Sequence, residues 1–72
     1  MDEMAVNNSI RDYINGHGIK QIYIANISGI SIKKLNDIVN NRVKCTISDM
    51  IKISRALGLN DEFFLINNSP DK

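Results

Sequence analysis

The sequence predicts an all-α domain built from five short helices. Apolar residues recur at spacings of three and four along most of the chain, whereas no run alternates apolar and polar residues for long enough to form a strand. Four glycines and one proline in 72 residues leave few forced breaks, and the glycines separate pieces of helix length. A chain this short has room for a single hydrophobic core, so we expect one domain over residues 1–66 and a flexible tail over residues 67–72.

The first two helices are separated by glycines. The first is marked by apolar side chains spaced four residues apart, namely Val6, Ile10 and Ile14. It should end at residues 15–18, where two glycines lie. The second is expected over residues 20–27, with Ile24 and Ile27 on its apolar side, and should end in the turn of residues 28–30.

A third helix is expected from Ser31 to Asn40. Ser31 suits the position before the first turn, because its hydroxyl can accept a hydrogen bond from a backbone N–H that has no partner inside the helix. The inward edge of this helix consists of apolar residues, namely Leu35, Ile38 and Val39.

Two further helices follow. Thr46 and Asp49 predict the start of the fourth, because their side chains can cap each other's backbone N–H groups. Its apolar side is expected to consist of Ile47, Met50, Ile51 and Leu57. The fifth is expected after Asn60 as its cap, with the carboxylates of residues 61–62 at its N-terminus. Residues 63–66 are all apolar, so at least one of them should be exposed.

A glycine in a short turn between two helices lets the second helix cross the first steeply. Residues 19–31, Ile-Lys-Gln-Ile-Tyr-Ile-Ala-Asn-Ile-Ser-Gly-Ile-Ser, contain such a turn and resemble the helix-turn-helix of phage Cro and lambda-repressor-like DNA-binding domains. Residues 53–59 are similar to the fourth helix of that family. The resemblance spans residues 6–66 and is carried by Gln21, Ala25, Gly29, Ser31, Leu57 and Gly58.

The resemblance implies a compact five-helix domain whose second and third helices form the helix-turn-helix. It also implies a phage or bacterial transcriptional regulator, such as a repressor, that occupies a palindromic operator as a homodimer with its third helix in the major groove of double-stranded DNA. The family pattern carries phosphate contacts over to Gln21, Asn40, Arg42 and Lys44. Ser31 and the hydroxyl of Tyr23 are further candidates for phosphate binding, with packing as the alternative for Tyr23.

The third helix carries a polar face that follows from spacing alone. Its members fall at offsets of 0, 3, 4 and 7, and they are Lys33, Asn36, Asp37 and Asn40. Amide and ammonium groups bind adenine and guanine edges, and an exposed isoleucine can lie against a thymine methyl. Asp37 can accept from a cytosine amino group or pair with Lys33. We therefore expect base contacts from Ile32, Lys33, Asn36 and Asp37, with an ordinary solvated helix face as the alternative.

Positive charge is concentrated in the same region. The chain has nine basic and eight acidic residues, a net charge of +1. Residues 20–44 contain five of the basic residues and one acidic residue, a balance of +4, which leaves four basic and seven acidic residues, a balance of −3, elsewhere. Basic side chains that neutralise phosphates release counterions, so this distribution favours a DNA-binding surface.

A second class of function stays open: a protein-interaction module, such as an antitoxin or a co-regulator, that keeps the fold. Exposed apolar side chains would form its partner surface, or the contact of a homodimer, at Ile22, Phe64 and Ile66. Tyr23 would extend this surface beside Ile22. Closure of the core is an equal alternative for Phe64.

The sequence argues against an enzyme. Cys45 is the single cysteine and can form no internal disulfide, and no second ligand lies at metal spacing from His17. We therefore expect no catalytic residue, no metal and no cofactor. No apolar run approaches the roughly 20 residues that cross a bilayer, and the first residues are acidic rather than basic, so we expect a cytoplasmic protein that does not bind membranes.

Overall fold

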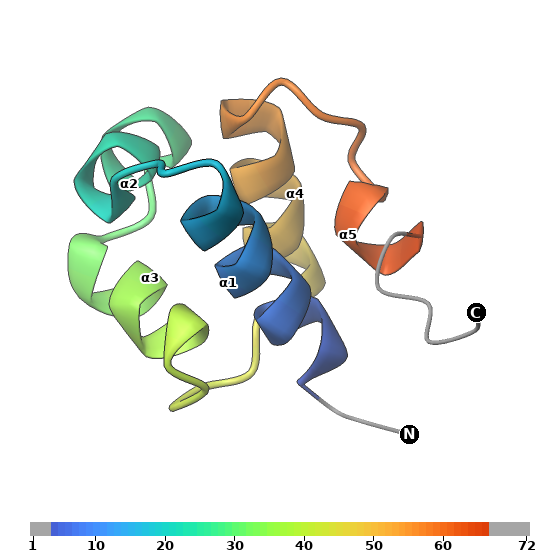
Figure 1. Ribbon diagram of the computed structural model, residues 1–72, viewed down its shortest axis with the longest axis horizontal. Coiled ribbons are helices and arrows are strands. Elements are labelled where there is room, and N and C mark those ends of the chain that lie inside the picture. The colour runs from blue at the N-terminus through green and yellow to red at the C-terminus, as the bar shows by residue number, and fades with distance from the viewer. Residues whose placement is uncertain (1–3, 67–72) are drawn as a thin grey trace.

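The computed structural model describes residues 4–66 and contains five α-helices, with no strand in this part of the chain (Figure 1). They are α1 (Ala5–Gly16), α2 (Gln21–Ser28), α3 (Ile32–Val39), α4 (Ile47–Ala56) and α5 (Phe63–Ile66). The prediction of an all-α fold is therefore confirmed, and α1 to α4 lie close to their expected positions. The tail predicted over residues 67–72 lies outside the described residues.

α1 occupies the middle of the domain. Figure 1 shows α2 and α3 on one side of α1 and the short α5 on the other. α1 packs against α3 and α5, while α4 packs against α2 and α5. This arrangement leaves α2 and α3, which also pack against each other, together at one end of the molecule.

The core consists of apolar side chains from all five helices and from the segments between them. They are Ile10, Ile14, Ile24, Ala25, Ile30, Leu35, Ile38, Val39, Cys45, Met50, Ile53 and Phe64. The inward edges predicted for α1 and α3 are thus confirmed, with Val6 only partly buried. Complete burial of one such large side chain contributes about 1.5 to 3 kcal/mol, so these residues supply most of the stabilising free energy.

Both predicted hydroxyl caps are present. The Ser31 hydroxyl accepts a hydrogen bond from the backbone N–H of Lys34 at 3.0 Å, at the start of α3. The Thr46 hydroxyl accepts from the backbone N–H of Asp49 at 3.1 Å, at the start of α4. Each bond provides a partner for an N–H that the helix itself leaves unpaired.

The expected apolar side of α4 is wrong at Ile47, which is 67% exposed. The inward side of this helix is centred on Met50 and Ile53, and Ile51 and Leu57 pack at its margin. Ile47 lies in the first turn, where the Cα–Cβ bond tilts toward the helix N-terminus and carries the side chain past the end of the helix.

The fifth helix also differs from its prediction. It begins at Phe63 rather than directly after Asn60, whose backbone carbonyl accepts a hydrogen bond from the Phe63 N–H at 3.0 Å in a preceding turn. The carboxylate of Asp61 does not serve the helix N-terminus, because it accepts two hydrogen bonds of 2.9 Å from the guanidinium of Arg55. Leu65 is exposed, which confirms that the apolar residues of this segment cannot all be buried.

Phe64 is wrong as a partner or dimer surface, because its side chain has no exposed area. Its ring packs edge-to-face against Tyr13 of α1 and against Phe63, with ring centroids 5.8 and 5.1 Å apart. Such edge-to-face pairs favour the buried position beyond the area that they remove from water. Phe64 therefore closes the core between α1 and α5, and the side chain of Ile66 lies outside the part of the structure that is described.

One fully buried polar side chain connects α1 to the end of α3. The amide nitrogen of Asn7 donates to the backbone carbonyls of Ile38, at 3.1 Å, and Val43, at 2.7 Å. Its amide oxygen accepts from the backbone N–H of Cys45 at 2.9 Å. Asn7 therefore provides partners for two backbone groups of the irregular segment between α3 and α4, the Val43 carbonyl and the Cys45 N–H. Its third bond is to the Ile38 carbonyl of α3.

We predict that Asn7→Ala lowers the free energy of unfolding by about 2 to 4 kcal/mol, because it leaves buried carbonyl and N–H groups without partners and opens a small cavity. Urea denaturation followed by far-ultraviolet circular dichroism measures the loss. Asn15→Ala is the matched control, since Asn15 is an exposed residue of the same helix. Equal and small effects of the two substitutions would contradict the role given to Asn7.

Candidate nucleic-acid interface

The turn between α2 and α3 sets the direction of α3. Gly29 has a φ of 81°, a left-handed conformation in which a Cβ atom would be strained, and its N–H donates to the Ala25 carbonyl at 3.1 Å. The next N–H, of Ile30, donates to the Ser28 hydroxyl at 3.2 Å. The side chain of Ile30 is then buried in the core. The turn is thus fixed by hydrogen bonds and by the burial of Ile30.

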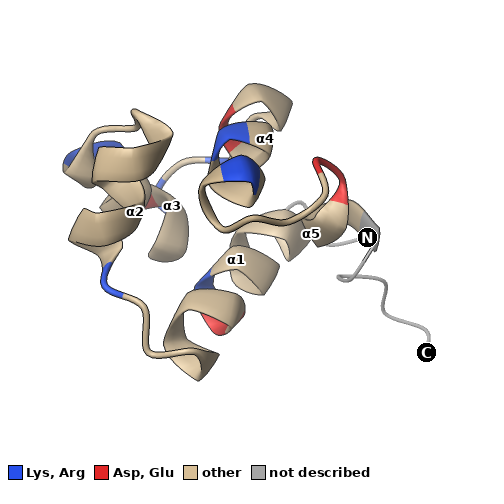
Figure 2. Cartoon of the chain, turned by 90° about the horizontal axis from the view of Figure 1, so that it is seen from above, with Lys and Arg blue, Asp and Glu red and all other residues tan. Residues whose placement is uncertain are grey.

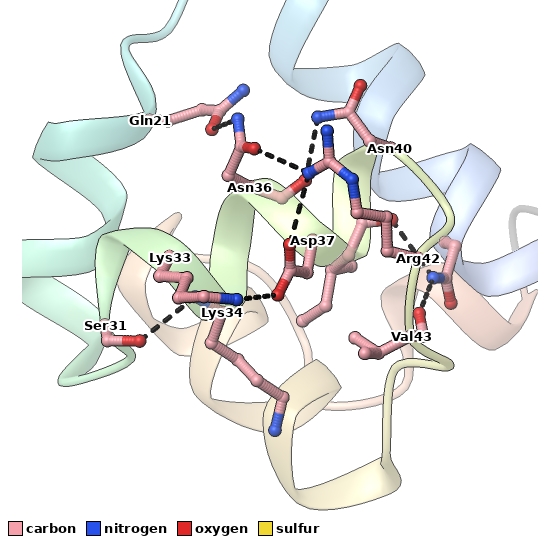
Figure 3. Close-up of polar contacts among 11 residues, drawn as sticks. Gln21, Ser31, Lys33, Lys34, Asn36, Asp37, Asn40, Arg42 and Val43 are labelled. Atoms are coloured by element: carbon pink, nitrogen blue, oxygen red, sulfur yellow. Dashed lines mark hydrogen bonds and ion pairs between the residues drawn. The ribbon is translucent and has the colours of Figure 1, made fainter.

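The outward side of α3 is polar, as predicted, and its acidic residue has two cationic partners (Figure 3). The Lys33 ammonium nitrogen lies 2.9 Å from Oδ2 of Asp37, so the pairing that was one of the two alternatives for Asp37 is present. A guanidinium nitrogen of Arg42, in the loop after α3, donates to Oδ1 of Asp37 at 3.1 Å. Each oxygen of the carboxylate therefore has its own cation.

Side-chain amides extend this cluster to α2 (Figure 3). The same guanidinium nitrogen of Arg42 donates to the Asn36 side-chain oxygen at 3.0 Å. The Asn36 side-chain nitrogen donates in turn to the Gln21 side-chain oxygen at 3.3 Å. We call Gln21, Lys33, Asn36, Asp37 and Arg42 the α3 polar network. All five are predicted site residues, and hydrogen bonds join them across α2, α3 and the following loop.

The remaining predicted DNA-contacting residues surround this network. Asn40, the last residue before the loop, donates from its side chain to the Asn36 backbone carbonyl at 2.9 Å. Ile32 is exposed at the start of α3, Ser31 is exposed although its hydroxyl caps the helix, and Lys44 is exposed in the loop. Tyr23 is 56% exposed on α2, so the packing alternative for it is wrong.

Ion pairs alter the charge distribution that the sequence indicates. The Lys34 ammonium turns away from the α3 polar network and lies 3.0 Å from Oδ2 of Asp49 on α4. Counting Asp49 with residues 20–44 lowers their balance from +4 to +3. Within residues 4–66, Lys20 and Lys44 are the basic residues of this region that have no ion-pair partner. The acidic residues 61–62 lie at the far end of the molecule from α2 and α3 (Figure 2).

The ionisation of Asp37 follows from its partners. The hydrogen bond from Lys33 has the largest effect and lowers the pKa of Asp37 below its ordinary value. Burial opposes this shift as the second largest effect, and the hydrogen bond from Arg42 adds to the lowering. Asp37 is therefore a carboxylate at neutral pH. The α3 polar network therefore holds two positive charges and one negative charge, a net charge of +1 at the outward side of α3. A nucleic acid bound at this side would face that net positive charge.

Two features of this surface differ from the sequence-based expectation. Ile27 is 49% exposed, because α2 buries Ile24 and Ala25 and turns Ile27 outward with Tyr23. Arg42 was expected as a free phosphate contact but pairs with Asp37 and Asn36. Arg42 is only five residues from Asp37 and six from Asn36 in the sequence. This short separation was a signal that the loop after α3 could bring these side chains together.

His17 is exposed directly after α1, and Cys45 is buried just before α4. The His17 ring is exposed, stacks on Tyr13 with centroids 4.0 Å apart, and has its Nδ1 atom 2.9 Å from the Tyr13 carbonyl oxygen. Burial, with a further contribution from Asp49, raises the pKa of Cys45 to about 12. The thiol is therefore protonated at neutral pH and is a poor nucleophile.

We predict that the fold weakens as the pH falls below about 4. Burial raises the pKa of Asp49, but hydrogen bonds from Lys34 and Thr46 outweigh it, so the pKa lies below its ordinary value. A depressed pKa contributes stability that is present above the unfolded-state value of about 3.9 and is lost as the pH falls through the folded-state value. Urea midpoints from pH 7 to pH 2 should show this loss, and Asp49→Asn should flatten it. Identical profiles for the two proteins would rule Asp49 out as a source.

Comparisons with protein-family models, with curated proteins and with solved structures found no match to this chain. Within residues 4–66, no helix has the length and apolar character needed to cross a membrane. In the same part of the chain, no three His, Cys, Asp or Glu side chains group closely enough to hold a metal ion. Function must therefore be inferred from the chemistry and placement of the side chains described above.

Proposed function

We propose that this chain is a sequence-specific DNA-binding transcriptional regulator of the Cro and lambda-repressor-like type, and that it occupies a palindromic operator as a homodimer. In this proposal α2 and α3 form the helix-turn-helix and α3 lies in the major groove of double-stranded DNA. The observation that carries the proposal is the outward side of α3. It is polar, Lys33 of α3 and Arg42 of the following loop place two cations there, and Lys33 is exposed, while the opposite side of α3 is buried.

The geometry of α3 suits the major groove in two respects. Its outward side chains are hydrogen-bond donors and acceptors of the kinds that bind base edges, and Ile32 adds an apolar group at its first residue. A free α-helix fits the width of the major groove, which is about 12 Å. The helix is also held firmly, because the Gly29 turn fixes its beginning and Asn7 fixes its end. A helix with a fixed direction is what a base-reading element needs.

The residues divide into two roles. We assign base contacts to Ile32, Lys33, Asn36 and Asp37. We assign phosphate contacts to Gln21, Tyr23, Ser31, Asn40, Arg42 and Lys44. Phosphate contacts supply affinity that depends on salt and not on sequence, whereas base contacts supply discrimination. Ile22, which is 51% exposed, remains the candidate contact of a homodimer.

A second function rests on α2, whose outward side is unusually apolar. Ile22, Tyr23 and Ile27 are each about half exposed, and no acidic or basic residue lies within this helix. Exposed apolar patches of this kind mark protein contacts more often than free surface. An antitoxin or co-regulator would use such a surface, and its binding would depend only weakly on salt.

The test of DNA binding is selection of duplexes from a randomised pool on the purified protein at low salt, followed by a salt titration on the enriched sequences. The proposal expects a two-fold symmetric site whose affinity falls steeply as salt rises. Weak and uniform binding without enrichment would overturn the proposal and favour the apolar side of α2 as the functional surface.

We predict different consequences for two lysines. Lys33→Ala should relax the preference at one base position of each half-site, because a good base contact is worth about 1 to 3 kcal/mol. Lys44→Ala should weaken all sequences alike and reduce the salt slope by about one unit, because it removes one phosphate contact. Lys52→Ala is the control, since Lys52 is an exposed lysine of α4 outside residues 20–44. The division of roles is wrong if the Lys33 and Lys44 variants behave identically across a panel of sites.

A further inference from the structure

Lys33 and Asp37 present a donor and an acceptor side by side at the outward side of α3. Their facing atoms, the ammonium nitrogen and Oδ2, are 2.9 Å apart. The Lys33 side chain is 85% exposed, so the ammonium can reach a ligand and still remain beside the carboxylate. A carboxylate oxygen has two lone pairs, and the structure uses one contact at each oxygen of Asp37. Each oxygen therefore keeps one acceptor position.

A G·C base pair has the complementary arrangement on its major-groove edge. Guanine presents two acceptors, N7 and O6, and cytosine presents the N4 amino donor next to O6. O6 and N4 are hydrogen-bonded to each other, so they are about 2.9 Å apart, the same spacing as the two atoms of the protein pair. A lysine can bridge N7 and O6 of one guanine, and an aspartate can accept from cytosine N4.

At an A·T pair the central donor and acceptor exchange places. The amino group lies on adenine, and the O4 acceptor lies on thymine next to the C5 methyl. The Lys33 ammonium then has no purine with two adjacent acceptors, and the charged pair faces a methyl group. The chemistry of the pair therefore favours G·C.

The rest of the α3 polar network fixes where the carboxylate lies. Arg42 donates to Oδ1 of Asp37 and to the Asn36 side chain, and Asn36 donates to Gln21 on α2. The Asp37 side chain is only 15% exposed, and its two carboxylate oxygens are held by Lys33 and Arg42. Arg42, Asn36 and Gln21 thus act as positioning residues for the Lys33–Asp37 pair.

We propose that Lys33 and Asp37 act as one unit that selects a single G·C base pair in each half-site, with Lys33 donating to guanine and Asp37 accepting from the cytosine amino group. The inference rests on the proposed DNA-binding function and specifies which base pair α3 prefers. Asp37 also disfavours other pairs, because a carboxylate that finds no amino donor only repels the phosphates around it. Asp37 is thus a specificity-determining residue that lowers the affinity for sequences that place no amino donor opposite its carboxylate.

The experiment uses the duplex enriched by the wild-type protein, with the position sensitive to Lys33 synthesised as each of the four base pairs. Dissociation constants are measured for the wild type, Asp37→Asn and Lys33→Met at one salt concentration. The wild type should prefer G·C by about fivefold or more, which corresponds to the lower end of one good base contact. Both variants should lose this preference at the same position, and the double variant should lose no more than either single variant.

Glu62→Gln is the matched control, because it removes one negative charge from an exposed residue outside the α3 polar network. It should keep the full preference for G·C.

Asp37→Asn should also bind the three other base pairs more tightly than the wild type does. Circular dichroism of each variant establishes that it is folded, and Lys33→Met supplies the result on its own if Asp37→Asn does not fold, since Lys33 is a largely exposed side chain.

Three outcomes overturn the inference in distinguishable ways. If Asp37→Asn binds all duplexes more tightly with an unchanged base preference, the carboxylate only repels the DNA phosphates and reads no base. The proposed DNA binding would then still hold. If the wild type prefers A·T at this position, or if the two variants affect different positions, the pair does not read G·C as one unit. If the wild type enriches no duplex, the proposed function fails and this inference fails with it.

Discussion

The buried side chain of Asn7 is the interaction on which the placement of the candidate site depends. It donates to carbonyls at the end of α3 and in the following loop, and it accepts from the N–H of Cys45 just before α4. The segment between α3 and α4 has no regular structure, so its buried backbone groups need partners from elsewhere. One amide on α1 provides two of them, for the Val43 carbonyl and the Cys45 N–H, and it also bonds the Ile38 carbonyl of α3. The loop that carries Arg42 and Lys44 is therefore held in a single path across the end of α3.

This constraint acts together with the turn at Gly29. The turn sets the direction in which α3 leaves α2, and Asn7 sets where α3 ends. Asn41, in the loop, adopts a φ of 59°, a left-handed conformation that asparagine tolerates better than most residues, and its side chain donates to Asn8 of α1. With both ends of α3 fixed, Arg42 reaches back to Asp37 and Asn36. The polar network is thus a consequence of backbone placement.

The sequence predicted those parts of the fold that depend on local chemistry. Ser31 and Thr46 were identified as caps because a hydroxyl before a helix has a clear partner in the first turn. Leu35 and Ile38 were identified as core because they repeat at helical spacing. The Lys33–Asp37 pair was predictable for the same reason, since its members are four residues apart on one helix.

The errors concern positions where tertiary packing decides. Ile47 and Ile27 lie at helical spacing from buried residues, yet Ile47 lies in the first turn of α4 and Ile27 lies on the outward side of α2, so both are exposed. The local sequence does not distinguish core from surface for Phe64, and its packing against Tyr13 places it in the core. Asn7 lies on the same side of α1 as Ile10 and Ile14. A polar residue within this apolar stripe indicates a buried side chain with hydrogen-bond partners, which the sequence analysis did not predict. The Lys34–Asp49 contact has no local signal, because it joins residues of separate helices.

The central claim is that the outward side of α3 binds DNA, and backbone amide chemical shifts recorded during titration with the enriched duplex test it most directly. The largest shifts should occur at residues 31–44 and at the start of α2 when the enriched duplex is added. A scrambled duplex should cause only small shifts at the same residues. The amides of α5 and of the first turns of α1 should change little. Shifts concentrated on the outward side of α2, or spread evenly over the domain, would contradict the claim that α3 is the DNA-reading element.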